Sequence, residues 1–108
     1  MERWKEISIS GIAKIEKCVA EFNIWELNIS PYAKFKVKVY ESNSGKFSGY
    51  SNLLIADEKE NFNCAVGYGG SIDEALQDTL NNFFQLSAYK PALEWKQEDF
   101  RYSDSFNF

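Results

Sequence analysis

The chain has 108 residues, of which 44% are hydrophobic and 17% aromatic; this predicts one globular domain over residues 1–108 and excludes an intrinsically disordered protein. The formal net charge of −4 argues against a general nucleic-acid binder, because such proteins draw much of their affinity from neutralising phosphates. The absence of histidine excludes Ser-His-Asp and Cys-His catalytic sites and His-ligated zinc, which leaves only carboxylates, Lys, Tyr or a divalent metal for catalysis.

The first quarter of the chain has an ambiguous pattern. Apolar residues alternate at 7 and 9 and again at 25, 27 and 29, whereas those at 12, 15, 19 and 22 also fit one helix face. We expect residues 4–29 to be mostly strand. The N-terminus has no apolar run typical of a signal peptide or a membrane span, so we expect a cytoplasmic protein without a membrane partner. Cys18 and Cys64 lack metal-ligand spacing and are expected to be buried, reduced thiols.

Residues 33–41 alternate strictly and predict a strand with one buried face. The opposite face carries Lys34, Lys36, Lys38 and Tyr40. Such a face can hold a partner by charge and stacking, but alternating Lys also keeps a strand soluble, so this strand is a secondary binding candidate. Residues 46–56 predict the returning strand of a hairpin, and residues 62–68 predict a further strand. Together these segments indicate an antiparallel meander of about four to six strands.

A helix is predicted over about residues 71–88. Ser71 stands at the N-cap with Glu74 three residues later, which is capping-box spacing. The apolar positions share one wide face, which we expect to pack on the sheet, giving an α+β fold. Gly67, Gly69 and Gly70 precede the helix without the motif of a dinucleotide or phosphate loop, and acids in the first turn would repel phosphate. We expect these glycines to turn the chain off the strand edge.

Residues 62–86 resemble the strand–loop–helix unit of HicB-like antitoxins, through a glycine loop followed by "SIDEALQDTL". The resemblance implies a similar sheet-and-helix unit. The chain departs from the family pattern, since Gly69-Gly70 replaces the usual Gly-Asp and the stretch after the helix is too short for a helix-turn-helix.

The last 15 residues combine acids with aromatic rings. Aromatic anchors surrounded by acids are typical of a surface that binds a basic protein, although the same rings could instead close the core. The predicted partner-binding residues are Trp95, Glu98, Asp99, Phe100, Tyr102, Asp104 and Phe106. A second acidic stretch, residues 57–61, lacks calcium-loop spacing and is expected to be a solvated turn.

These observations predict a non-enzymatic, macromolecule-binding protein. Its most specific form is a small acidic inhibitor, antitoxin-like or an anti-defence protein of a phage or mobile element, that blocks a basic nucleic-acid-handling or defence protein of its host. We expect no cofactor, no metal and no nucleic-acid partner, while an exposed hairpin edge allows a homodimer by strand pairing. Two alternatives remain open: a nucleotide-binding or sequestering protein, and a metal-dependent enzyme built on carboxylates.

Overall fold

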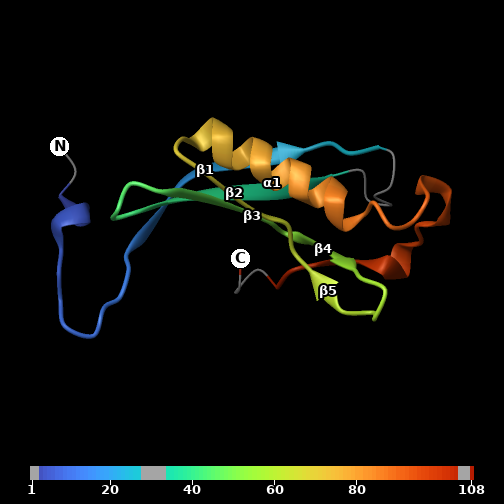
Figure 1. Cartoon of the computed structure of the whole chain (residues 1–108), viewed down its shortest axis with the longest axis horizontal. Helices are drawn as coiled ribbons and strands as arrows, with labels where there is room; N and C mark the ends of the chain where they lie inside the picture. The colour runs from blue at the N-terminus through green and yellow to red at the C-terminus, as the bar shows by residue number, and fades with distance from the viewer. Residues whose placement is uncertain (1–2, 28–33, 105–107) are drawn as a thin grey trace.

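The computed structural model describes residues 3–27, 34–104 and 108, and it has an α+β architecture (Figure 1). Within these residues, seven antiparallel strands form two sheets, and one main helix packs on the larger sheet. This confirms the predicted fold class. The elements are η1 (Trp4–Glu6), β1 (Glu16–Ile24), β2 (Phe35–Ser42), β3 (Phe47–Ser51), β4 (Leu53–Ala56), β5 (Phe62–Asn63), β6 (Val66–Gly69), α1 (Ile72–Leu86), η2 (Ala92–Glu94), η3 (Gln97–Asp99) and β7 (Phe100–Tyr102).

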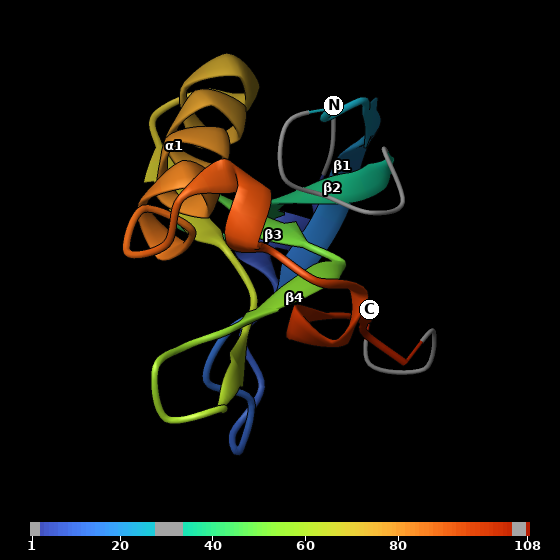
Figure 2. The same cartoon turned by 90° about the vertical axis from the view of Figure 1, so that its right-hand side faces the viewer.

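The main sheet has the strand order β1-β2-β3-β6. The alternation predicted for β2 is present: Phe35, Val37 and Val39 are at most 2% exposed and face α1. The ring of Phe35 stacks on that of Phe83 in α1, with centroids 4.5 Å apart. Figure 2 shows α1 on one side of this sheet and the end of the chain on the other side. The face with even-numbered β2 residues is therefore not covered by the helix.

The glycines before α1 permit close packing. Our expectation that they turn the chain was wrong for Gly67 and Gly69, whereas Gly70 lies in the bend between β6 and α1. Gly67 and Gly69 lie within β6, and neither has a positive φ. A Cβ atom on Gly67 would lie 2.2 Å from the backbone nitrogen of Thr79, and one on Gly49 would lie 2.2 Å from its Oγ1. The helix therefore rests directly on the backbone of β3 and β6. Thr79 is fully buried there. Its hydroxyl is not left unpaired by this burial, because it donates to the carbonyl of Ala75 at 2.7 Å.

The segment predicted as one returning strand is divided between the two sheets. β3 continues the main sheet, whereas β4 joins a second sheet with the order β5-β4-β7. Asn52 makes the break: its side-chain oxygen accepts from the backbone N–H of Lys36 at 2.7 Å, and its carbonyl accepts from that of Ser103 at 2.7 Å. Both sheets contribute to one buried cluster, in which Leu53, Ile55 and Phe100 join the residues under α1.

The expectation of mostly strand over residues 4–29 was correct only for β1. Residues 7–15 form an arm that extends from the body (Figure 1), with a turn closed by the 3.0 Å bond from the N–H of Ile12 to the carbonyl of Ile9. Gly11 allows this turn at φ +94°. No strand among the described residues pairs with the arm, and a strand forms only where a neighbour completes its ladder. Residues 28 and 29 lie outside the described residues.

Candidate protein-binding surface

The tail after α1 folds back onto the second sheet and places two predicted partner-binding residues inside the protein. Trp95 is 9% exposed and Phe100 is 4% exposed, with ring centroids 5.4 Å apart. The indole N–H of Trp95 donates to the carbonyl of Lys90 at 3.2 Å. These two rings therefore belong to the core, which is the alternative that the sequence left open for the tail aromatics.

Asp99, a third predicted residue, is occupied by contacts within the chain. Its carboxylate lies 3.0 Å from the ammonium of Lys90 and accepts from the backbone N–H of Lys96 at 2.9 Å. Burial alone would raise the pKa of Asp99, but the Lys96 N–H and the Lys90 charge together lower it below its ordinary value. The same pairing raises the pKa of Lys90. Asp99 therefore fixes the tail on the body and offers little to a partner.

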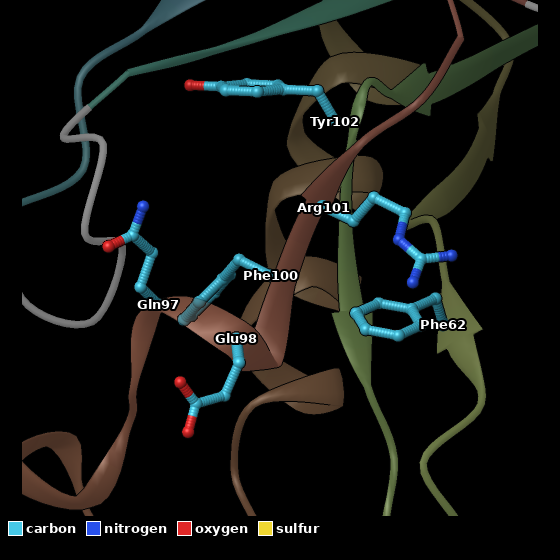
Figure 3. A pocket seen from close by; sticks show the side chains of 6 residues that line it. All are labelled: Phe62, Gln97, Glu98, Phe100, Arg101 and Tyr102. Carbon is cyan, nitrogen blue, oxygen red and sulfur yellow. The ribbon is translucent and has the colours of Figure 1, made fainter.

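Part of the tail lines an open groove of about 550 Å³ beside β7 (Figure 3). We call this the tail groove; it is lined by Phe62, Gln97, Glu98, Phe100, Arg101 and Tyr102. The guanidinium of Arg101 lies 4.1 Å from the ring centroid of Phe62, a cation–π contact between β7 and β5. Figure 3 shows Glu98 and Gln97 projecting from η3 at one end of the groove, with Tyr102 at the other end.

The tail groove is built on ordered elements. β7 pairs with β4 through three residue pairs, and the hydroxyl of Tyr102 donates to the carbonyl of Lys34 at 2.6 Å. Glu98 is exposed and has no ion-pair partner among the described residues. Asp104 is also exposed, and residue 106 lies outside the described residues. Of the predicted set, Glu98, Tyr102 and the buried Phe100 thus meet in one groove.

The structure also brings the two acidic stretches of the sequence to one end of the molecule. Residues 57–61 and 94–99 together carry six acids and two bases. Tyr89 lies between them: burial raises its pKa, and the charges of Asp99, Asp57 and Glu58 add to the increase. We call this region, the loop 57–61 with residues 94–99, the acidic end. It adjoins the tail groove through Phe62 and Glu98.

Within the acidic end, Asp57 has a structural role. Its carboxylate accepts from the backbone N–H groups of Lys59 and Asn61 at 2.8 and 2.9 Å and from the side-chain amide of Asn63 at 3.2 Å. These bonds, the one from Asn61 first, lower its pKa. This geometry is the solvated turn predicted for residues 57–61. Among the described residues, no three His, Cys, Asp or Glu side chains converge as a metal site would require.

The Lys strand predicted as a secondary candidate lies on the uncovered face of the main sheet. Glu21 of β1 approaches both Lys36 and Lys38, at 3.3 and 4.0 Å. Tyr40 contacts Tyr50 edge-on, with centroids 5.8 Å apart, while Lys34 lies 5.0 Å from the ring centroid of Trp25. These basic groups are therefore partly neutralised.

Sequence reasoning missed three residues that line the tail groove: Phe62, Gln97 and Arg101. Of these three, only Arg101 could have been found from the sequence, because Arg is enriched at interface hot spots and this one lies among acids and aromatic residues. Phe62 could not be connected with the tail, because only the pairing of β4 with both β5 and β7 brings it there. The cysteines are not disulfide-bonded, as expected, but neither is buried, and Cys18 is exposed.

No protein-family model, curated protein or solved structure matches the chain. Among the helices of the described residues, none has the length and apolar character needed to cross a bilayer.

Proposed function

We propose that this chain is a non-enzymatic protein-binding module that docks its tail groove and acidic end on a basic surface of another protein. The observation that carries the proposal is the groove itself: an exposed carboxylate, an Arg stacked on a Phe, and a Tyr surround one hollow beside the edge strand β7. Tyr and Arg are enriched at the energetic centres of protein interfaces, and surrounding acids steer a basic partner.

The edge position of β7 supports the same proposal. Among the described residues, β7 pairs only with β4 in the order β5-β4-β7, so it is an edge strand, and the groove extends from it across the sheet to Phe62 of β5. An extended segment of a partner can add its backbone to such an edge while its side chains enter the groove. The specific role that we propose is inhibition of a basic nucleic-acid-handling or defence protein, as an antitoxin-like or anti-defence factor of a phage or mobile element. The resemblance of residues 62–86 to the HicB-like unit stays a prediction.

A charge-reversal experiment tests this function. Tagged wild-type chain, the Glu98→Lys variant and the Glu6→Lys variant are used as bait in nuclease-treated bacterial lysate, and retained proteins are quantified by mass spectrometry. Glu6 is exposed in η1, at the opposite end of the molecule (Figure 1), so its reversal is a matched control for net charge.

We expect one basic protein to be retained equally by wild type and Glu6→Lys and at least tenfold less by Glu98→Lys, which corresponds to about 1.4 kcal/mol of binding free energy. Equal retention by all three baits, or retention of no protein by the wild type, would contradict the proposal. The two alternatives stay predictions: thermal melts with nucleotides test the first, and activity assays with Mg²⁺ and chelator test the second.

A further inference from the structure

The uncovered face of the main sheet already holds an aromatic residue, Phe108. The ammonium of Lys38 and the hydroxyl of Tyr40 both donate to the main-chain oxygen of Phe108, each at 3.2 Å. The same ammonium lies 4.6 Å from the centroid of the Phe108 ring. Two neighbouring outward residues of β2 therefore recognise both the oxygen and the ring of one amino acid, 68 and 70 positions away in sequence.

Space remains beside this contact. A cavity of about 240 Å³ lies between β1, β2 and the returning tail, and it is lined by Glu21, Lys36, Lys38, Asn52, Ser103 and Phe108. The Ser103 hydroxyl is buried and has no hydrogen-bond partner among the described residues. A buried hydroxyl without a partner is costly, so a bound group with an acceptor oxygen would be favoured here.

The hydrogen-bond donors and charges on this face determine which kind of ligand it can bind. Lys38 is a donor only, and Tyr40 keeps its proton at neutral pH, because burial, followed by neighbouring Cys18 and Glu16, raises its pKa further above 10. An acceptor oxygen next to an aromatic ring satisfies both groups. Glu21, placed between Lys36 and Lys38, offsets their charge and would repel a phosphate, which argues against nucleic acid as the ligand.

We propose that this face is a second binding site, specific for an extended peptide segment with an aromatic residue, and that Phe108 is its occupant within the chain. The partner residue places its ring under the Lys38 ammonium and its main-chain oxygen against Lys38 and Tyr40. Phe108 must leave before that residue enters, so the site is held closed until a partner segment competes for it. This site is independent of the tail groove, and its test does not involve Glu98.

The test supplies the segment in trans. The probe is a fluorescein-labelled peptide with the sequence of residues 103–108, titrated against the Phe108→Ala chain by fluorescence anisotropy. We expect saturable binding to Phe108→Ala and at least tenfold weaker binding to the wild type, where the tethered residue competes at high effective concentration. A peptide in which its last Phe is replaced by Ala should bind at least tenfold more weakly than the parent peptide.

A second pair of variants locates the site. The chains Phe108→Ala/Lys38→Met and Phe108→Ala/Lys46→Met remove the same charge from the β2 face and from the β2–β3 turn, respectively. We expect the Lys38 variant to lose at least tenfold in affinity and the Lys46 variant to bind like Phe108→Ala. Absence of binding to folded Phe108→Ala, or equal binding of the parent and Ala peptides, would overturn the proposal.

A measurement on the wild type guards against misfolding of the variants. At saturating peptide, NMR signals of Phe108, Lys38 and Tyr40 should shift while those of α1 do not. Unchanged signals at these three residues would also overturn the proposal.

Discussion

At the scale of single residues, the closest packing in this protein depends on glycines, which have a hydrogen atom in place of a side chain. Gly49 and Gly67 sit side by side on β3 and β6, paired in the ladder, and Thr79 of α1 lies over both. Neither glycine is needed for a positive φ. Their role is steric, and it explains why a Thr occupies the centre of an otherwise apolar helix face.

Substitution of Gly67 by Ala should therefore be strongly destabilising. The new Cβ would meet backbone atoms of Thr79 and Asp78 at 2.2 and 2.7 Å, and backbone cannot move aside as a side-chain end can. We expect the free energy of unfolding to fall by roughly 1–3 kcal/mol or more, measured by urea denaturation. Gly70→Ala is the matched control, because its Cβ would meet only the carboxylate of Glu74, at 3.2 Å; a loss of stability as large in the control would contradict the steric account.

At the scale of elements, the two edges of the main sheet are protected in different ways. At β6, the carboxylate of Asp78 accepts from the N–H of Tyr68 at 2.8 Å, and the amide of Asn82 donates to the carbonyl of Val66 at 2.6 Å. Side chains of α1 thus take the place of a neighbouring strand. At β1, the register shifts between Cys18 and Ala20, and such a bulge interrupts a flat edge. The expected exposed hairpin edge is absent from the described residues, because β2 and β3 each have a strand on both sides in the order β1-β2-β3-β6. A homodimer stays a prediction, and strand pairing would have to use β1.

Removing the side chains that satisfy β6 should expose a sheet edge. For the double variant Asp78→Ala/Asn82→Ala, we expect a loss of about 1 kcal/mol per hydrogen bond and concentration-dependent association, seen by light scattering. The variant Gln77→Ala/Asn81→Ala removes two exposed polar groups from the same helix, and we expect its stability and its association state to match those of the wild type. Association of both variants to the same extent would argue against an edge effect.

At the scale of the whole molecule, the chain is elongated, with principal extents of 49 × 27 × 21 Å. The arm with η1 lies at one end and the acidic end at the other (Figure 1). The two acidic stretches of the sequence thereby lie together, at the end of the molecule opposite the arm. The tail that carries the groove is attached to this end through the Lys90–Asp99 pair and the buried Trp95.

The attachment of the tail should depend on pH. Since the pKa of Asp99 is lower in the folded protein than in the unfolded chain, its contribution to stability is present above the unfolded value of about 3.9 and is lost as the pH falls through the folded value. Asp99→Asn should therefore lower Tm by a few degrees at pH 7, with a difference from the wild type that shrinks towards pH 3. Calorimetric melts at pH 7 and pH 3 check this. If the difference in Tm between Asp99→Asn and the wild type were the same at both pH values, the loss of stability would come from the shape of the side chain rather than its charge.

What the sequence by itself determined is local. The alternation of β2, the Ser71–Glu74 cap and the apolar face of α1 each depend on residues within a few positions, and all three are present. The cap, for example, joins two residues three positions apart: the backbone N–H of Glu74 donates to the Ser71 hydroxyl at 3.2 Å.

Tertiary structure alone decided everything that depends on distant partners. The break at Asn52 needs contacts with both Lys36 and Ser103, although a poor strand former in mid-strand was a local hint. The burial of Trp95 and Phe100, the groove shared by β5 and β7, and the seat of Phe108 on β2 join residues far apart in sequence. Local patterns determine which face of a helix or strand is apolar. Which surface covers that face depends on the packing of the whole chain, and a short stretch of sequence does not contain that information.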